Sequence, residues 1–226
     1  MVAGTRTTRT YEHFCALARA LEQVGDRWTL LVVRDLLTGP RRFTDLMDLL
    51  GGITPKTLTQ RLRELEAAGV VAADREPGRR EVWYRLTAAG EELAPVVRAL
   101  FHWGVRHNLR PRAPGEKVHP EHLLKALLMV LDDAEPPRRA VRWQFELSDG
   151  ATYTLTHDGT WSLSVGRHGE PDVTVASHRD GLVRYLLGRS DDRTASSHAV
   201  ELRGNQRAIT EFTRLLRHFP PASVAP

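Results

Sequence analysis

The sequence predicts an α+β protein of two domains, and three observations along the chain indicate this. In the first half, apolar residues recur at helical spacing and lead into a pair of short strands. In the second half, three consecutive runs alternate apolar and polar residues with a period of two, which is typical of strands. Between the halves, Arg110–Gly115 has the composition of a linker. We therefore expect a mostly helical domain over residues 1–110 and an α+β domain over residues 116–226.

Size and composition narrow the class of protein. The chain has 226 residues, of which 27% are charged, and it contains one cysteine, Cys15. A single cysteine excludes an internal disulfide framework and suits a reducing compartment. The sequence has no apolar run of the roughly 18 residues that a membrane span requires. The first residues also lack the apolar centre of a secretion signal, so we expect a cytoplasmic protein without a membrane partner.

The positive charge is concentrated in the first half of the chain. Residues 1–110 hold 17 Lys and Arg against 13 Asp and Glu, an excess of 4. Residues 111–226 hold 15 against 15, so their excess is zero. A basic surplus confined to one domain is the pattern that an electrostatic partner such as nucleic acid requires, although four charges are a modest surplus.

Four helices are expected in the first half, because apolar residues recur there every three or four positions. The expected helices cover residues 12–24, 28–37, 45–50 and 55–68. Thr44 is expected to cap the third helix, and the pair Gly51 and Gly52 to end it. Thr54 is expected to cap the fourth, with Pro55 at the first turn, where a missing N–H costs nothing.

A hairpin with a basic tip follows the fourth helix. Residues 70–74 and 81–86 are expected to form its strands, joined by the turn Glu76–Arg80. Thr87 is then expected to cap one long helix over residues 88–107. Helix, glycine turn, amphipathic helix and hairpin, in this order, indicate a winged helix-turn-helix, in which the second helix of the motif enters the major groove of duplex DNA.

The fourth helix offers side chains suited to DNA. Leu58, Leu62 and Leu65 stand at helical spacing and are expected to face the core. The opposite face carries Lys, Thr, Gln and Arg, whose donors and acceptors match base edges and phosphates. Arginines before the third helix and at the hairpin are placed to contact the backbone. The expected DNA contacts are Arg41, Arg42, Thr54, Lys56, Thr57, Thr59, Gln60, Arg61, Arg63, Arg75, Arg79 and Arg80. The alternative is a polar helix face that is merely solvated.

The second half is expected to contain an antiparallel sheet covered by helices. Three strands over residues 141–147, 152–156 and 161–165 are separated by the tight-turn pairs Asp149-Gly150 and Asp158-Gly159, which indicates a meander. The remaining expected elements are a helix over 120–131, a fourth strand over 173–176, a helix over 181–187, a strand over 199–202 and a helix over 206–218.

The segments Gly25–Leu31, Gly52–Leu58 and Leu100–Gly104 are among those that match a known family. Over residues 15–104 the chain resembles the HxlR-type winged-helix transcriptional regulators. The resemblance implies a homodimeric bacterial regulator, with dimer contacts from the first and last helices of the domain. Asp26-Arg27 stands where the family usually has Gly-Lys, which changes the charge before the second helix.

Cys15 falls where members of this family that sense oxidants or electrophiles carry their reactive cysteine. Arg19, one helical turn further on, is placed to stabilise a thiolate, and the reactivity of a cysteine follows its thiolate fraction. The alternative is a small buried residue that packs against its neighbours.

The second half resembles the sterol-carrier-protein-like fold, in its three-strand meander and in the segments Gly181–Gly188 and Val200–Gly204. The resemblance implies a curved sheet whose helices enclose a cavity for a small hydrophobic ligand. The candidate lining residues are Leu127, Trp143, Phe145, Tyr153, Trp161, Leu163 and Tyr185. The alternative is that these side chains simply fill a core.

Catalytic and metal-binding patterns are not found in the sequence. His119 and His122 form the only close helical pair of histidines, and no second cysteine or paired carboxylate completes a metal site. The chain has no nucleophile elbow, no phosphate-binding loop and no dinucleotide fingerprint. We therefore expect no cofactor, no metal and no enzyme activity.

Two hypotheses for the function follow. The first is a sequence-specific DNA-binding transcriptional regulator, a homodimer whose C-terminal domain binds a small hydrophobic effector. The second is a lipid-binding or small-molecule-binding module in which the winged helix serves mainly for dimerisation. The first predicts duplex DNA, a second copy of the chain and a small hydrophobic ligand as partners.

Overall fold

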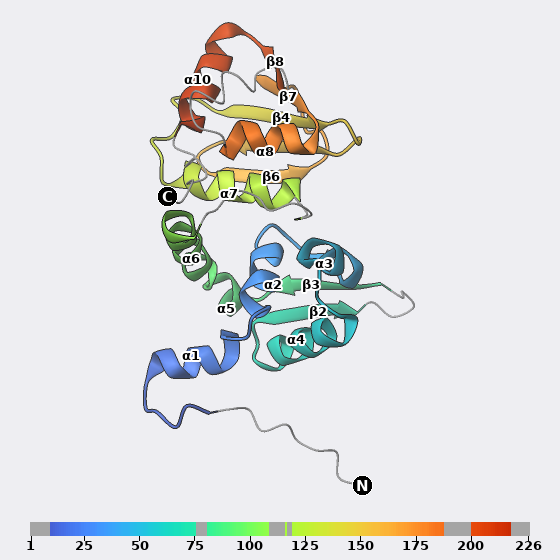
Figure 1. Ribbon diagram of the computed structural model, residues 1–226, viewed down its shortest axis with the longest axis vertical. Coiled ribbons are helices and arrows are strands. Elements are labelled where there is room, and N and C mark those ends of the chain that lie inside the picture. The colour runs from blue at the N-terminus through green and yellow to red at the C-terminus, as the bar shows by residue number, and fades with distance from the viewer. Residues whose placement is uncertain (1–9, 76–80, 109–115, 117–118, 188–199, 218–226) are drawn as a thin grey trace. The chain divides into compact units, whose positions relative to one another are not determined.

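The chain divides into two units, residues 1–99 and 100–226, in the computed structural model (Figure 1). The structure describes residues 10–75, 81–108, 116, 119–187 and 200–217. The division falls within a helix, α6 (Ala94–His107). The linker expected at residues 110–115 lies outside the described residues, so the boundary placed there stays a prediction.

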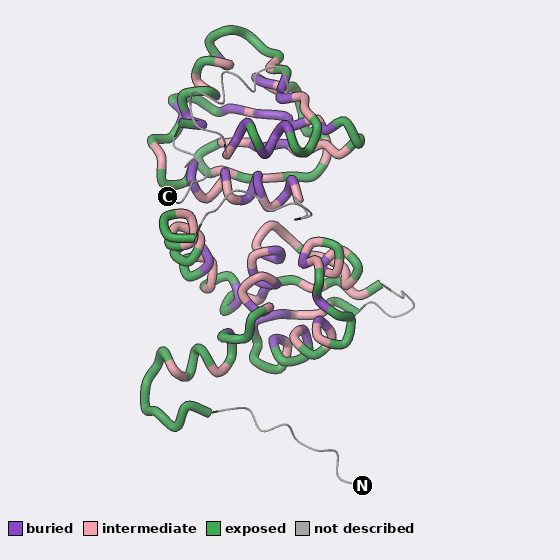
Figure 2. Tube along the Cα trace, in the orientation of Figure 1, coloured by how far each residue is buried: buried purple, intermediate pink, exposed green. Residues whose placement is uncertain are grey.

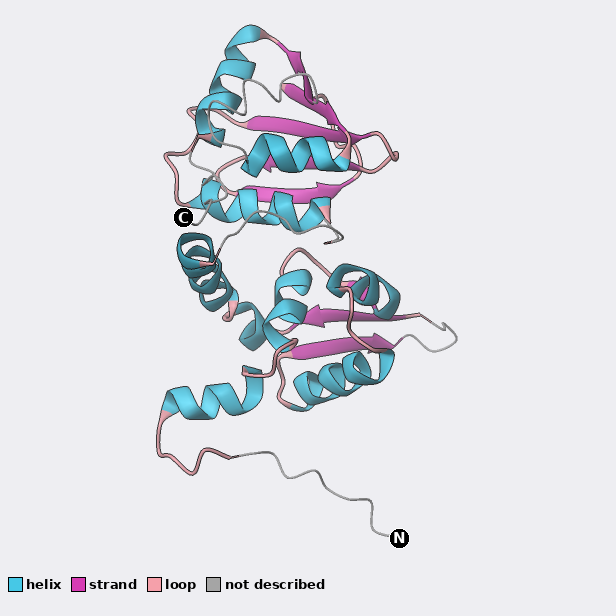
Figure 3. Ribbon diagram, in the orientation of Figure 1, coloured by secondary structure: helices cyan, strands magenta, loops and turns pink. Residues whose placement is uncertain are grey.

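The first unit contains five helices and a three-stranded sheet in its described part (Figure 3). The order of the predicted helices and of the hairpin is confirmed, and the short strand β1 is an addition to it. Its strands lie in the order β1-β3-β2, and both pairings are antiparallel. The elements are α1 (Ala16–Val24), α2 (Thr29–Leu36), β1 (Arg41–Arg42), α3 (Phe43–Leu50), α4 (Pro55–Ala67), β2 (Val71–Arg75), β3 (Val82–Leu86) and α5 (Ala88–Glu91).

The core of the first unit forms around α2, α3 and α4. The leucines predicted to face inward on α4 are at most 2% exposed. They are buried together with Val33 on α2, Leu46 on α3 and Val71 on β2. Figure 2 shows the resulting pattern on α4, where buried turns alternate with exposed ones. The burial of one face fixes which side of α4 is left for a partner.

Two local expectations in the first unit are wrong. α1 begins at Ala16 and not at residue 12, because the backbone of Cys15 is extended and Glu12 has a φ of 53°. Thr44 lies inside α3 and does not cap it. The cap is Arg42, whose backbone N–H donates to the Asp45 carboxylate at 2.9 Å.

The long helix expected over residues 88–107 is interrupted. α5 ends at Glu91, and α6 begins at Ala94 after a two-residue turn. Pro95 explains the break, because proline has no N–H to donate within a helix and its ring clashes with the carbonyl four residues earlier. The cap expected at Thr87 is confirmed, since its hydroxyl accepts from the Gly90 N–H at 3.1 Å.

The second unit contains helices α7, α8 and α10 and a five-stranded sheet in its described part (Figure 1). The strands lie in the order β6-β5-β4-β7-β8. The elements are α7 (Pro120–Asp132), β4 (Val141–Leu147), β5 (Thr152–His157), β6 (Trp161–Val165), β7 (Val173–Ser177), α8 (Arg179–Leu187), β8 (Val200–Gly204) and α10 (Gln206–Leu216).

This sheet is mixed, so the expectation of an antiparallel sheet is wrong in part. The meander β4-β5-β6 and the pair β7-β8 are antiparallel as expected, but β7 pairs with β4 in parallel. The chain leaves β6, crosses to the far side of β4 over residues 166–172, and enters β7 in the direction of β4. Alternation of apolar residues identifies a strand but not its direction, so the sequence did not reveal this pairing.

One core holds the second unit together. It takes side chains from α7, α8 and α10 and from the inward positions of β4, β5, β7 and β8. Trp143 packs edge-on against Phe212, with ring centroids 4.8 Å apart, and lies 4.9 Å from Trp161. Because this core is built entirely from residues 100–226, the second unit does not need the first for its hydrophobic interior.

Candidate nucleic-acid interface

Two glycines make the sharp turn between α3 and α4. Gly51 and Gly52 have φ values of 51° and 74°, in the left-handed region that side chains with a Cβ rarely adopt. Ile53 follows them into the core at 6% exposure. The turn sets the angle at which α4 leaves α3, which is the geometry of a helix-turn-helix.

The start of α4 is fixed by local hydrogen bonds, as predicted. Thr54 Oγ1 accepts from the Thr57 backbone N–H at 3.2 Å and lies 2.8 Å from Thr57 Oγ1. Pro55 occupies the first turn. The Thr59 hydroxyl donates to the Pro55 carbonyl at 2.8 Å. The three threonines therefore already have partners within the helix, and Thr54 is the exposed one among them.

An exposed strip runs along the outer face of α4. Lys56, Gln60 and Arg63 are four and three residues apart, so they lie on one side of the helix, and all three are exposed. Lys56 and Arg63 make no ion pair with any described residue. Gln60 Nε2 donates to Glu64 Oε1 at 2.5 Å. The strip thus offers two unpaired cations and, between them, one amide that can donate and accept.

Arg61 has a different environment from the rest of the helix. Its side chain is 17% exposed, and its guanidinium lies 2.5 Å from Glu64 Oε2 and 3.6 Å from Asp26 Oδ1. Asp26 lies in the connection between α1 and α2, and one of its oxygens also accepts from the Trp28 N–H at 3.0 Å. Arg61 therefore ties α4 to that connection within the fold.

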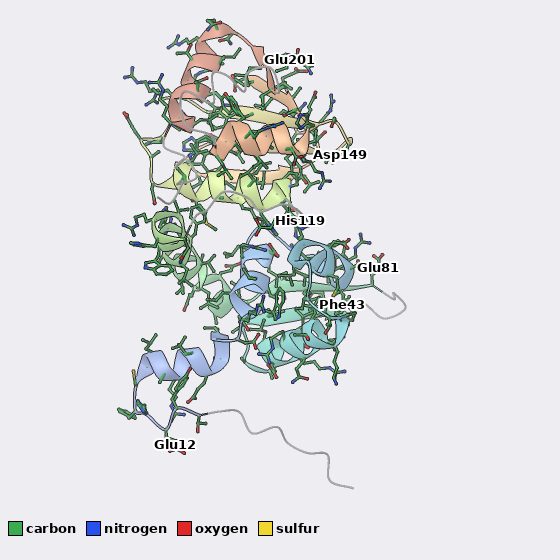
Figure 4. The ribbon with its side chains drawn as sticks, in the orientation of Figure 1. Glu12, Phe43, Glu81, His119, Asp149 and Glu201 are labelled. Carbon is green, nitrogen blue, oxygen red and sulfur yellow. The ribbon has the colours of Figure 1, made fainter. Side chains whose placement is uncertain are left out.

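The arginines of β1 also have partners. Arg42 donates to Glu81 Oε1 at 2.9 Å, and its guanidinium lies 5.3 Å from the centroid of the Trp83 ring. Glu81, labelled in Figure 4, directly precedes β3. The carboxylates of Glu81 and Asp45 raise the pKa of Arg42. Arg41 lies half-buried and donates to the Asp35 carbonyl at 3.4 Å and to Thr38 Oγ1 at 3.0 Å.

The wing strand β2 is bound to α4 through a charge pair. Arg75 donates to both oxygens of Glu66, at 2.7 and 2.9 Å. This pair raises the pKa of the arginine and lowers the pKa of the carboxyl group. Arg79 and Arg80, predicted at the tip of the wing, lie outside the described residues.

Among the described basic residues predicted to contact DNA, Lys56 and Arg63 are therefore unpaired. The other arginines have hydrogen-bond or ion-pair partners within the fold. Exposed ion pairs contribute about 0–1 kcal/mol, so a phosphate can displace most of these carboxylates at small cost. Two features were not predicted from the sequence: the short strand β1, and the exposed Trp83 on β3, which lies opposite Arg42. A two-residue strand carries no period, so only the register of the folded sheet shows it.

Cys15 is exposed at the N-cap of α1. The Arg19 guanidinium lies 3.3 Å from Glu22 Oε2, so the cation expected to stabilise a thiolate is paired with a carboxylate. The role of Cys15 as a redox sensor stays a prediction.

The side chains expected to line a hydrophobic pocket contribute to the core of the second unit. Leu127, Trp143, Phe145 and Tyr185 are at most 6% exposed. The other three, Tyr153, Trp161 and Leu163, are partly buried and pack against that core.

In the described part of the chain, no three histidine, cysteine, aspartate or glutamate side chains gather as a metal site would require. None of the helices described here is long and apolar enough to cross a membrane.

Comparison with known proteins gives a family match over the first unit. A family model described as HxlR-like helix-turn-helix matches residues 23–111. The chain is 37% identical over 114 residues to YkvN of Bacillus subtilis, which is named an uncharacterized HTH-type transcriptional regulator. That match covers 48% of this chain and 95% of the relative.

Two further relatives carry the same kind of name. A protein of Synechocystis sp. is 40% identical over 93 residues, which covers 41% of this chain and 69% of the relative. A protein of Mycobacterium tuberculosis is 42% identical over 106 residues, which covers 46% of this chain and 65% of the relative. The chain thus spans about two thirds of the length of these two relatives, and the three matches cover less than half of the chain.

Proposed function

The chain belongs to the HxlR-like family of helix-turn-helix transcriptional regulators, and from this premise we propose that it binds a specific duplex DNA sequence as a homodimer. The N-terminal part of α4 enters the major groove, and β1 and the wing contact the backbone on either side. The relatives are named as regulators, which are DNA-binding proteins and not enzymes.

One observation carries this proposal: the exposed strip of Lys56, Gln60 and Arg63, with both cations unpaired, on a helix whose opposite face is buried. Arg reads guanine through two parallel hydrogen bonds, and Gln reads adenine in the same way. To bind a base, Gln60 needs to break only its hydrogen bond to the Glu64 carboxylate. Burial of the leucine face supports the proposal further, because a rigid helix loses little freedom when it enters a groove.

The paired arginines divide into two roles. Arg42 and Arg75 are 42% and 56% exposed, so each can exchange its carboxylate for a phosphate without leaving water. The Arg61 side chain is far less exposed and bridges α4 to Asp26. We assign Arg61 to holding the recognition helix in place, although the sequence predicted it as a contact. Arg79 and Arg80 keep their predicted role at the tip of the wing.

Exposed apolar side chains support a homodimer. Phe14, Leu17 and Leu21 on or beside α1 are exposed, and so are Leu100 and Trp103 on α6. Large apolar side chains that are exposed in the isolated chain favour a partner that covers them. A second copy of the chain would cover them, and two recognition helices would then read two half-sites about one helical turn of DNA apart.

We assign the regulatory role to the second unit, as a sterol-carrier-protein-like domain that binds a small hydrophobic effector. Its self-contained core and its sheet covered by helices support a separate module. Such a ligand can change the affinity for DNA only if it binds the DNA-competent and DNA-incompetent dimers differently.

The salt dependence of binding tests the proposal against a carrier in which the winged helix only dimerises. Duplex DNA that the protein prefers is first selected from a random pool, and its affinity is then measured by fluorescence anisotropy between about 50 and 200 mM salt. Contacts to about six phosphates predict a loss of roughly a thousandfold over this range. If no duplex is enriched in the selection, or if the affinity barely responds to salt, a carrier function is favoured.

A further inference from the structure

The second unit has a groove of about 730 Å³ on the outer side of α10. The inner side of α10 is fixed in the core by Ala208, Phe212 and Leu215. The connection from α7 to β4 forms the opposite wall, and Figure 1 shows this connection beside α10. An Arg214–Glu135 contact of 3.7 Å joins the two walls. The groove is therefore a feature of one folded unit.

Positive charge dominates this groove. Arg138 and Arg139 line it from the connection, and Arg207 and Arg214 line it from α10. Arg214 pairs with Glu135, and Arg139 pairs at 3.2 Å with Asp172, which is not part of the lining.

Two of the four arginines remain uncompensated. Arg138 and Arg207 are exposed and have no carboxylate partner among the described residues. Both side chains line the same groove, so an anion bound there would be attracted to both guanidinium groups. The lining holds four arginines against Glu135 and Glu211, a net charge of +2, so the groove favours an anion.

The volume of the groove indicates the size of its ligand. Pockets of about 300–1,000 Å³ hold small molecules and cofactors. Duplex DNA is contacted by surfaces that fit its grooves or follow its backbone. The concave shape and the size thus favour a small anion over a nucleic acid.

The chemistry of the lining indicates the class of this anion. A phosphate monoester carries about −1.5 to −2 charges at neutral pH, against −1 for a carboxylate, and the forked guanidinium binds phosphate through paired hydrogen bonds. Glu211, one helical turn after Arg207, also lines the groove, and its carboxylate can only accept hydrogen bonds. We propose that this groove binds a small phosphate monoester that also carries hydroxyl groups, with Arg138 and Arg207 on the phosphate and Glu211 on a hydroxyl.

This site is separate from the hydrophobic pocket of the proposed function. None of the residues expected to line that pocket lines this groove. No residue of the strip on α4 lines the groove, so anion binding in the groove can be tested independently of DNA binding.

Calorimetric titration of the full chain with ribose 5-phosphate at low ionic strength tests the site. We expect saturable binding, and no binding of ribose, which lacks the phosphate. The double variant Arg138→Gln with Arg207→Gln should lose at least about tenfold in affinity. The matched control replaces Arg184 and Arg217, two exposed arginines outside the groove, by glutamine and should bind as the unaltered protein does. An unchanged thermal unfolding midpoint shows that each variant is folded.

A second variant tests Glu211. Glu211→Gln should raise the affinity for inorganic phosphate, because a negative charge is removed, and should reduce the preference for ribose 5-phosphate over inorganic phosphate. Equal losses in the groove and control variants, or no saturable binding of either phosphate, would overturn the proposal. So would a groove variant that still binds ribose 5-phosphate but has lost affinity for DNA, since the arginines would then be backbone contacts.

Discussion

Arg75 on β2 and Glu66 on α4 are joined by two hydrogen bonds of 2.7 and 2.9 Å, one to each carboxylate oxygen. The pair connects the strand that leads into the wing with the last turns of the recognition helix. Both partners are partly exposed, at 56% and 34% of their side-chain surface. The wing strand and the helix are thus linked by an exposed ion pair, in which a phosphate group can take the place of the Glu66 carboxylate.

Removing the carboxylate should release Arg75 for DNA. We expect Glu66→Gln to raise the affinity for the selected duplex by up to about fivefold, because the exposed carboxylate no longer competes for Arg75. The dependence on salt should become steeper by about one phosphate contact. Fluorescence anisotropy across a salt series measures both quantities. Glu201→Gln, which removes one charge from the second unit, is the control, and an identical response of the two variants would contradict the role of Arg75.

Arg61 and Arg63 are two residues apart and should behave differently. Arg63→Ala should weaken specific binding by roughly 1–3 kcal/mol and leave the stability unchanged, because this side chain has no partner in the described fold. Arg61→Ala should lower the free energy of unfolding by about 1 kcal/mol or less and affect binding less than Arg63→Ala does. Urea denaturation and a DNA titration on each variant separate the two effects. Equal losses of affinity would show that Arg61 is a direct contact.

Leu62 tests the buried face of α4. Its side chain is 2% exposed, so Leu62→Ala leaves a cavity and should cost about 2–5 kcal/mol of unfolding free energy. Urea denaturation measures this loss. A cost below about 1 kcal/mol, as is usual for exposed positions, would mean that the helix is not anchored by its leucines.

The Asp149–Arg179 pair should make the second unit sensitive to acid. Arg179 holds the pKa of the Asp149 carboxyl below its ordinary value of 3.8. A carboxyl group with a depressed pKa stabilises the fold above pH 3.8, and this contribution is lost as the pH falls through the lowered pKa. The difference in unfolding midpoint between the unaltered protein and Asp149→Asn should therefore be largest near neutral pH and shrink in acid. A difference that does not change with pH would contradict this assignment.

Leu17 tests the dimer. It lies on α1 with 67% of its surface exposed, and Leu17→Asp should give a monomer in sedimentation experiments at micromolar concentration. Loss of the dimer should also weaken binding to a two-half-site duplex, while a single half-site is bound as before. Val165→Asp is the matched control, because Val165 is 60% exposed on β6. A dimer that survives Leu17→Asp would place the interface elsewhere.

The parts of the fold that depend on neighbours in the sequence were predictable. The glycine turn, the Thr54 cap and the leucine face of α4 follow from conformational preferences and periodicity, and the structure confirms them. Pro95 also marked a helix break, but the apolar spacing on both sides of it suggested one continuous helix.

The parts that depend on distant contacts were not predictable. The partner of Arg61 at Asp26 lies 35 positions away in the chain, and β7 pairs with a strand about thirty residues earlier. Which arginines stay free for a phosphate is decided by such contacts. Residue type alone therefore gave a list of basic candidates, and tertiary structure divides that list into paired and unpaired side chains.

The most direct test of the account is a selection of binding sequences from a random duplex pool with the unaltered protein and with a Gln60→Ala, Arg63→Ala double variant. We expect the unaltered protein to enrich a two-fold symmetric sequence, and the variant to lose this preference while it keeps salt-sensitive nonspecific binding. Enrichment of the same sequence to the same extent by both proteins would show that the outer strip of α4 does not read DNA.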